Sequence, residues 1–226
     1  MQISPLAHVD PAARIGEGVT IEAGACIGPT EEIAHGTVVQ SGAALGRGGG
    51  AGGHGPTRIG VGCIVGSGAV LYHDVTLGAG AKIWHNTVIR SHVTIGEGSS
   101  IGSLSCIEHH TRVGCRCSVH SLCQVGDYSE VGDEVFIGPG FLSVSDLKLD
   151  FHRPQLHQAY KGVVIAARAR IGGRVLAYPG SVIGVETVVG AGSVVRGTLL
   201  DGVVYLGDPI RAVRKVYCAI STAPMM

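Results

Sequence analysis

Histidine and aspartate side chains recur in this sequence at a constant interval. This interval is the sequence separation between His109 and Asp127, and other members of the series are separated by it or by a multiple of it. One series contains His73, His109 and Asp127, and the series one residue later contains Asp74, His92, His110 and Tyr128. An imidazole that a neighbouring carboxylate holds in place can act as a general base near neutral pH. If residues separated by this interval are neighbours in space, His109 and Asp127 form such a pair, and His92 contacts His110.

Aliphatic residues at every sixth position explain why this interval is meaningful, because it equals three hexads. The longest uninterrupted run extends from Ile59 to Ile137, and glycine follows many of its members. Such a period is typical of a parallel β-helix, in which three hexads make one triangular coil. Stacked coils lie about 4.8 Å apart. About 28 hexads predict an all-β fold of about nine coils. The flat faces of such a prism suit self-association, and we expect a homotrimer.

Two segments interrupt the repeat. Residues 46–58 are rich in glycine, and residues 142–163 carry charged and aromatic side chains. We expect both to leave the coil as loops, which often carry binding residues. From residue 209 the apolar residues follow a near-helical spacing, which predicts a short terminal helix. The predicted organisation is a β-helix domain over 1–208, with loops 46–58 and 142–163, and a helical tail over 209–226.

Composition narrows the classes of partner. The formal net charge is zero, which argues against nucleic acid, and no run of about 18 apolar residues predicts a membrane span. The first residues lack a signal-peptide pattern. Of the seven cysteines, Cys63, Cys117 and Cys123 fall at inward positions of the hexad. Buried, reduced thiols are expected there, which favours a cytoplasmic location.

The hexad [LIV]-G-x-x-[STAV]-x resembles the repeat of the left-handed β-helix acyltransferases. Ile83-Trp84-His85 and the later Phe136-Ile137-Gly138-Pro139 are similar to segments of the nucleotide-sugar amino-sugar N-acetyltransferases within that group. The resemblance covers about residues 59–216. It implies a left-handed coil and transfer of an acyl group from a coenzyme A thioester, such as acetyl-CoA, to the amine of a small-molecule acceptor.

The resemblance also implies where the two substrates bind. His120 and Ser121 stand where that group typically carries Gln-Asn-Asn, near the acceptor and the thioester. The C-terminal repeats resemble the segment that packs beside coenzyme A, and the cofactor candidates there are Gly172, Gly190, Arg211 and Arg214. The two arginines are candidates for pairing with the phosphates of coenzyme A.

Attack on a thioester needs a nucleophile, a proton acceptor and donors for the developing oxyanion. His109, oriented by Asp127, and His120 are the leading candidates for the base. A mechanism without an enzyme base, in which the amine loses its proton to water or to the thiolate, stays open. The alternative for the whole histidine series is that these are solvated turn residues or contacts in a trimer interface.

The second loop is expected to fold over the acceptor. Ser145 and Asp146 align with polar residues of the resembling group, and Asp146 could bind an ammonium group. His152 and Arg153 could pair with phosphates. The alternative is a solvated loop without such contacts.

Three other functions are compatible with the repeat. The chain could acylate another acceptor, such as an amino acid, an antibiotic or a hydroxyl group. It could be a hydrase of the γ-carbonic-anhydrase type, whose zinc site needs two histidines five positions apart on one strand run; the hexad repeat contains no such pair. It could also be a scaffold without catalysis. We therefore expect an acyl-CoA-dependent enzyme with no metal.

Overall fold

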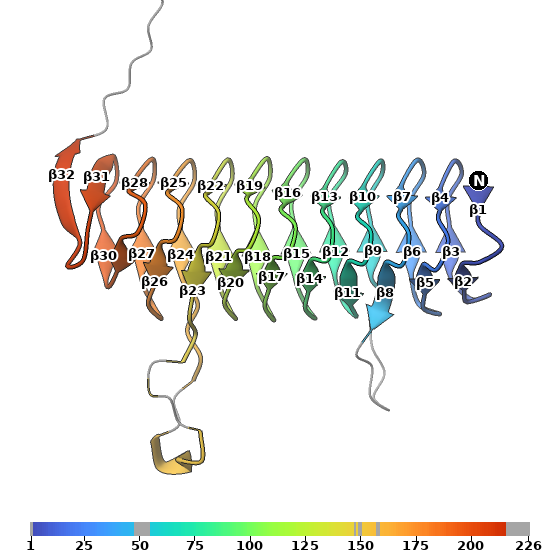
Figure 1. Cartoon of the computed structure of the whole chain (residues 1–226), viewed down its shortest axis with the longest axis horizontal. Coiled ribbons are helices and arrows are strands. Elements are labelled where there is room, and N and C mark those ends of the chain that lie inside the picture. The colour runs from blue at the N-terminus through green and yellow to red at the C-terminus, as the bar shows by residue number, and fades with distance from the viewer. Residues whose placement is uncertain (1, 48–54, 147, 149–150, 157–158, 216–226) are drawn as a thin grey trace, which may run out of the picture.

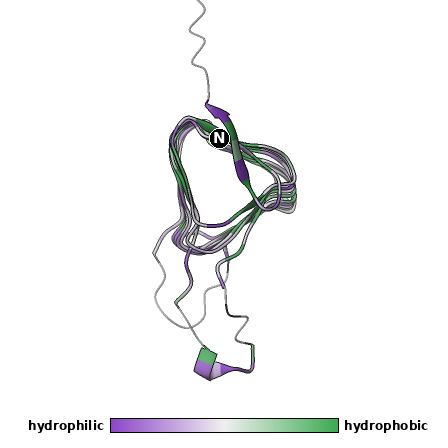
Figure 2. Cartoon of the chain, turned by 90° about the vertical axis from the view of Figure 1, so that its left-hand side faces the viewer, coloured by the Kyte–Doolittle hydropathy of each residue, from purple (hydrophilic) through white to green (hydrophobic). Residues whose placement is uncertain are grey.

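The chain winds as a parallel β-solenoid. The structure is a computed structural model that describes residues 2–47, 55–146, 148, 151–156 and 159–215. The coils stack along the long axis of the molecule, and the view down that axis is a triangle (Figures 1 and 2). The predicted all-β parallel β-helix is confirmed. The left-handed sense of the coil stays a prediction from the resemblance, because strand order and register are the same for both hands.

Three sheets form the faces of the triangle, and successive strands visit them in turn. The first sheet contains β1 (Gln2–Ile3), β4 (Thr20–Ile21), β7 (Val38–Val39), β10 (Ile64–Val65), β13 (Lys82–Ile83), β16 (Ser100–Ile101), β19 (Ser118–Val119), β22 (Phe136–Ile137), β25 (Arg170–Ile171), β28 (Val188–Val189), β31 (Val203–Leu206) and β32 (Arg211–Lys215). The second contains β2 (His8–Val9), β5 (Cys26–Ile27), β8 (Ala44–Arg47), β11 (Val70–Tyr72), β14 (Val88–Ile89), β17 (Cys106–Ile107), β20 (Gln124–Val125), β23 (Leu142–Ser143), β26 (Leu176–Ala177) and β29 (Val194–Val195). The third contains β3 (Arg14–Ile15), β6 (Glu32–Ile33), β9 (Arg58–Ile59), β12 (Thr76–Leu77), β15 (Thr94–Ile95), β18 (Arg112–Val113), β21 (Glu130–Val131), β24 (Val164–Ile165), β27 (Val182–Ile183) and β30 (Thr198–Leu199).

The hexad aliphatics fill the interior of the coil. Ile83 pairs with Ile101, and Ile101 with Val119, so neighbouring coils pair in a register of three hexads, as the sequence predicted. Ile83 and Ile101 are 0% exposed. Burying one such side chain contributes about 2 kcal/mol. The repeat therefore stabilises the coil through a continuous column of aliphatic contacts.

Small polar side chains turn inward at the corners and bond to the next coil. Ser99 Oγ donates to the carbonyl of Gly114 at 2.7 Å, and Thr87 Oγ1 donates to that of Gly102 at 3.0 Å. The thiol of Cys63 does the same toward Gly78 at 3.1 Å. Cys63, Cys117 and Cys123 are buried free thiols, as predicted. These donors stabilise the stacking because buried carbonyl groups need partners.

The number of coils was underestimated from the sequence. The first sheet is 12-stranded, and only its last strand, β32, is antiparallel to its neighbour, so about eleven parallel coils are present rather than nine. Some strands fall outside the strict period. Leu199 follows Val195 at a shorter spacing than one hexad, yet it is 4% exposed and lies on the next strand of the solenoid. A count of perfect hexads misses such strands.

The predicted C-terminal helix is wrong over the described residues. Arg211–Lys215 forms strand β32, which pairs antiparallel with β31. The last coil leaves the backbone groups of β31 at an open sheet edge, and pairing with a following strand satisfies them. A short apolar pattern does not distinguish helix from strand, so this edge decides the structure. Residues 216–226 lie outside the described residues.

Both interruptions of the repeat leave the coil from the same edge. The first lies between β8 and β9, and the second between β23 and β24, so each joins the second sheet to the third. Figure 1 shows β8 and β23, the strands from which they leave, on the same side of the solenoid. The second contains the 3-10 helix η1 (Pro154–Leu156). Within the described ranges, no helix is long and apolar enough to cross a membrane.

Candidate functional site

The edge from which the loops leave also carries most of the ionisable side chains that the sequence singled out. We call it the histidine corner. It consists of the turns that follow β11, β14, β17 and β20, with side chains His73, Asp74, Ser91, His92, His109, His110, Asp127 and Tyr128. One loop leaves the coil before the first of these turns and the other after the last. The polar ladder therefore lies between the roots of the two loops.

Backbone pairing sets the spacing of the ladder. Leu71 pairs with Ile89, so equivalent turn residues of neighbouring coils follow one another at about 4.8 Å. The outer series has φ values between 57° and 62°, at Asp74, His92, His110 and Tyr128. Leu104 and Glu134 at the other two corners adopt the same left-handed conformation. This backbone geometry is thus a property of the coil, and only the side chains distinguish the histidine corner.

Three aromatic rings stack on the outside of this corner. The rings of His92 and His110 have centroids 4.7 Å apart and planes 12° apart, which confirms their predicted contact. Tyr128 continues the stack, 4.9 Å from His110. Burial lowers the pKa of His110, and the imidazoles of His92 and His109 lower it further, against the smaller opposite effect of Asp127. His110 is therefore neutral at physiological pH.

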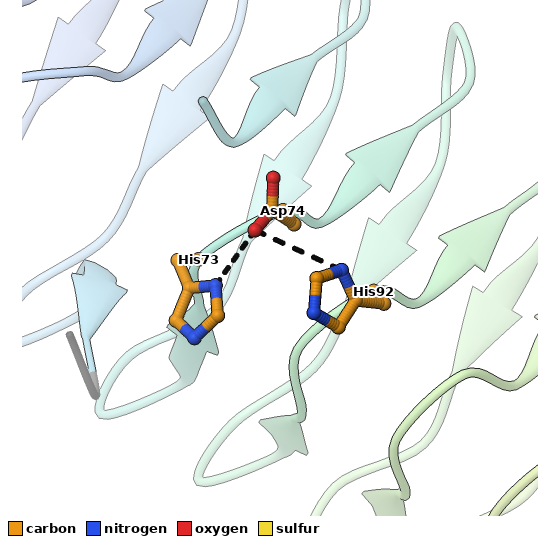
Figure 3. Close-up of side chains that lie close together, drawn as sticks. All are labelled: His73, Asp74 and His92. Carbon is orange, nitrogen blue, oxygen red and sulfur yellow. Dashed lines mark hydrogen bonds and ion pairs between the residues drawn. The ribbon is translucent and has the colours of Figure 1, made fainter. Parts of the chain in front are cut away.

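A second network occupies the first two coils of the corner (Figure 3). Nδ1 of His73 lies 2.8 Å from Oδ2 of Asp74, and Nε2 of His73 lies 2.9 Å from Oγ of Ser91. Nδ1 of His92 lies 3.7 Å from the same Asp74 oxygen. Burial would raise the pKa of Asp74, but hydrogen bonds from His73 and the Gly55 backbone, with the charge of His92, lower it overall. Asp74 is therefore ionised at neutral pH.

The imidazole of His109 is hydrogen-bonded to an arginine. Arg90 Nε donates to Nε2 of His109 at 3.2 Å, so the proton of the neutral ring lies on Nδ1. The Arg90 guanidinium also lies 4.4 Å above the Tyr72 ring and 3.7 Å from the Glu108 carboxylate. These partners were not predicted from the sequence, although Tyr72, Arg90 and Glu108 follow the same interval of three hexads.

The carboxylate of Asp127 is hydrogen-bonded to a serine on the next coil. Ser145 Oγ donates to Asp127 Oδ2 at 2.9 Å, and the Lys161 backbone N–H donates to the Ser145 carbonyl at 3.1 Å. The predicted hydrogen bond between His109 and Asp127 is not formed within the described part of the chain. Stacking brings the two residues to neighbouring coils, but each side chain has a different partner. Asp127 therefore fixes the root of the second loop.

The other loop candidates lie further from the coil. The Lys148 backbone N–H donates to Oδ1 of Asp146 at 2.8 Å. His152 and Arg153 are exposed beside η1, in the segment that Figure 1 shows extending away from the solenoid. The His152 ring packs against Phe151, with centroids 4.2 Å apart. The structure therefore places Ser145 and Asp146 at the corner but does not bring His152 and Arg153 to it.

His120 and Ser121 lie at a different corner, in the turn from the first sheet to the second. They line a cavity of about 290 Å³ that we call the Trp84 pocket, with Trp84, Ser100, Gly102, Ser103, Ser118 and Val119. The Trp84 indole N–H donates to Ser100 Oγ at 2.8 Å and so holds the indole as one wall. The exposed His120 ring packs edge-on against Phe136, 5.1 Å between centroids.

The four cofactor candidates lie on the coils that follow the Trp84 pocket. Gly172 and Gly190 occupy the same turn position as His120, after β25 and β28. A Cβ on Gly172 would lie 2.5 Å from the Ala191 backbone nitrogen, so close coil stacking by itself explains that glycine. Arg211 and Arg214 are exposed on β32, at the C-terminal end of the first sheet. The two glycines thus lie at the corner that carries His120, and the two arginines lie at the end of the first sheet.

Comparisons with known proteins agree with this architecture. The family model described as bacterial transferase hexapeptide (six repeats) matches residues 56–91 and 74–109. Comparison with curated proteins gave no significant match.

Solved structures share the coil. A UDP-N-acetylglucosamine acyltransferase from Campylobacter jejuni is 16% identical over 95% of this chain and 75% of its own, with a TM-score of 0.63. The enzyme of that name from Bacteroides fragilis is 21% identical over 94% of this chain and 74% of its own, with a TM-score of 0.57. At these identities the likeness establishes a common fold. The chain therefore contains the bacterial transferase hexapeptide repeat over residues 56–91 and 74–109, and it shares the β-helix fold of these two acyltransferases.

Proposed function

We propose that this protein is an acyl-CoA-dependent acyltransferase that transfers an acyl group, most simply acetyl, to an amine of a nucleotide-linked amino sugar. The observation that carries the proposal is the position of His120. This imidazole lines a cavity of about 290 Å³, two coils before Gly172 along the same corner. Trp84, Ser100 and Gly102 of the cavity wall lie within the residues that match the transferase hexapeptide repeat. A pocket with a titratable group is a reasonable place for acyl transfer.

The donor would extend from this pocket toward the C-terminal end of the first sheet. Gly172 and Gly190 carry no side chains, so nothing projects from these two positions that would block a bound donor. Arg211 and Arg214 lie exposed beyond it and could pair with the phosphates of coenzyme A. This arrangement would leave the thioester near the Trp84 pocket.

The structure favours His120 over His109 as the base. His109 Nε2 already accepts a hydrogen bond from Arg90, whereas the His120 ring faces a cavity. In the proposed step the acceptor, if bound as an ammonium ion, first gives one proton to water. The neutral nitrogen then attacks the thioester carbonyl carbon and loses a second proton to His120. The C–S bond then breaks, and the departing thiolate takes up a proton to give free coenzyme A. A general base of this kind contributes about 10²–10⁴ in rate.

The acceptor would contact the histidine corner. Ser145 and Asp146 stand at its end, and a carboxylate beside an amine would favour binding of the ammonium form before attack. His152 and Arg153 could reach a phosphate of the nucleotide from the second loop. His120 and Ser145 belong to different edges of one chain, so a homotrimer that brings the corner of one protomer to the pocket of the next would join the two parts.

The described cysteines are all free, which suits a protein that works in a reducing compartment, so we propose a cytoplasmic location. The test of the activity is direct. Purified protein is incubated with acetyl-CoA and a panel of amino sugars, amino acids and their nucleotide conjugates, and free thiol is followed. Acetylated product with an amino sugar supports the proposal. No thiol release with any amine, together with no binding of coenzyme A by calorimetry, would exclude it.

A further inference from the structure

Three potential metal ligands converge at the start of the histidine corner, beside the root of the first loop (Figure 3). Asp74 Oδ2 lies 2.8 Å from Nδ1 of His73 and 3.7 Å from Nδ1 of His92. One ligand atom from each residue lies within 4.8 Å of the other two. Two imidazoles and one carboxylate are a donor set that Zn²⁺ uses where its fourth position holds water or substrate.

We infer that His73, Asp74 and His92 bind one divalent transition-metal ion, Zn²⁺, with one coordination position left open to an oxygen ligand. Zinc–nitrogen and zinc–oxygen bonds of about 2.0–2.2 Å in a tetrahedron separate neighbouring ligand atoms by about 3.3 Å. The observed distances of 2.8 and 3.7 Å lie on either side of that value. Small rotations of the side chains therefore suffice to complete the site.

The coil holds the ligands in place before any ion binds. Asp74 and His92 are equivalent turn residues on neighbouring coils, because Leu71 pairs with Ile89. The Asp74 backbone N–H also donates to the Gly55 carbonyl at 3.3 Å, which ties this turn to the end of the first loop. A site on paired strands loses little conformational entropy when it binds its ligand.

Ser91 supplies the outer contact that metal-binding histidines normally have. Its Oγ lies 2.9 Å from Nε2 of His73, on the side of the ring away from Asp74. Without metal, Nδ1–H of His73 donates to Asp74 and Nε2 accepts from Ser91. When the ion binds, the neutral ring carries its proton on Nε2 and donates it to Ser91, so that Nδ1 presents its lone pair to the ion. Such outer contacts fix the tautomer and typically change metal affinity 10–100-fold.

Solvent exposure also favours a metal ion at these three residues, and so do the hydrogen bonds that engage the other side chains of the corner. The side chains of His73, Asp74 and His92 are 14%, 25% and 46% exposed, so an ion can enter from solvent. On the following coils, His109 Nε2 is held by Arg90 and Asp127 by Ser145. Within the described ranges, His73, Asp74 and His92 are the one such group of three or more side chains. The sequence predicted no metal, because the repeat contains no pair of histidines five positions apart on one strand run, whereas these ligands come from two coils.

The test uses untagged protein stripped with a chelator. Zn²⁺ is titrated by calorimetry, and bound metal is counted by mass spectrometry after desalting. Co²⁺ is added separately, because a tetrahedral Co²⁺ site shows strong visible absorption. His73→Ala and His92→Ala are compared with His35→Ala, which removes an exposed histidine from another corner. Thermal unfolding without metal shows whether each variant is folded.

About one Zn²⁺ per chain is expected for the wild type and for His35→Ala. Folded His73→Ala and His92→Ala should lose at least about 100-fold in affinity, and Ser91→Ala about 10-fold. Zinc should also raise the melting temperature of the wild type but not of His92→Ala. Binding that is absent from the wild type, or equal in folded His92→Ala, would overturn the inference. The result is independent of the proposed acyl transfer, since no step of the experiment measures turnover.

Discussion

Ser145 donates a hydrogen bond to Asp127 at 2.9 Å and thereby joins the last turn of the histidine corner to the root of the second loop. The two residues occupy equivalent turn positions on neighbouring coils, and the second loop leaves the coil directly after Ser145. Asp127 is thus a positioning residue for the loop that we expect to cover the acceptor. Loss of this contact is therefore expected to weaken binding of the acceptor.

Ser145→Ala should weaken acceptor binding with little effect on the chemical step. A hydrogen bond to a carboxylate at a half-buried site contributes about 1 kcal/mol, so we expect the KM for the acceptor to rise about 5-fold. Steady-state kinetics with varied acceptor and saturating acetyl-CoA measure this. Ser41→Ala, which removes a serine–carboxylate hydrogen bond to Glu22 far from the loop, is the matched control. A fall in kcat at unchanged acceptor KM would contradict the positioning role.

The two candidate bases should respond differently to substitution. His120→Ala should lower kcat by about 10²-fold or more with little change in KM, because the imidazole accepts the proton in the transition state. His109→Ala should have a smaller effect, since Arg90 already occupies its Nε2. Wild-type turnover in both variants would show that the enzyme uses no histidine base. His35→Ala serves as the control for removal of an exposed imidazole.

The scaffold was predictable because one physical rule generates it. The interval of three hexads placed His92 against His110, and the position within the hexad placed the thiols of Cys63 and Cys117 inside the coil. The structure confirms each. Backbone pairing fixes such neighbours regardless of side-chain type. The same rule identified the two loops, since any insertion must leave at a corner.

The partners of individual side chains were less predictable. Stacking arithmetic gives the neighbouring coil but not the rotamer, so it proposed His109 with Asp127 where Arg90 and Ser145 compete successfully. It did place His120 and His109 in different columns, because they follow different hexads of the three-hexad coil. The terminal strand was missed because an open sheet edge is a three-dimensional requirement.

Glu31 provides a test of stability against pH. This buried carboxylate accepts a hydrogen bond from the Thr57 backbone N–H at 3.1 Å at the end of the first loop. Burial raises its pKa above 4.5, against the smaller lowering by Thr57 and Thr30. The folded state therefore binds this proton more tightly than the unfolded state, and its contribution to stability is lost as the pH rises through the raised pKa.

Glu31→Gln removes that titration and keeps the shape of the side chain. Chemical unfolding of both proteins should show the stability difference moving in favour of the variant as the pH rises from about 4 to about 7. Glu97→Gln, at an exposed carboxylate on another corner, is the control for the substitution itself. A pH-independent difference for Glu31→Gln would contradict the raised pKa.

Cys106 should be almost inert toward alkylation. Burial and the Glu108 carboxylate raise the pKa of its thiol to about 12, and Cys106 Sγ lies 3.3 Å from Glu108 Oε1. At pH 7.5 its thiolate fraction is on the order of 10⁻⁴ or less. Glu108→Gln should speed labelling of Cys106 by iodoacetamide, followed by peptide mass spectrometry. Cys63, whose pKa is raised by burial without Glu108, is the internal control. Equal acceleration at Cys63 would indicate general loosening of the coil.

Complementation between two impaired variants tests the arrangement of the site. If His120 of one protomer works with the histidine corner of the next, His120→Ala and Asp127→Ala chains impair different halves of each site. Because the two edges lie apart on one chain, a mixed trimer contains some interfaces in which both halves are intact. Random mixing should leave both halves intact in about one quarter of the interfaces, so at limiting acceptor the mixture should exceed the mean activity of the separate variants. The mixture is made by refolding the two variants together, and its mass is measured by light scattering. Activity no higher than that of the separate variants, in trimers shown to be mixed, would mean that each chain acts alone and that its acceptor binds elsewhere than at the neighbouring histidine corner.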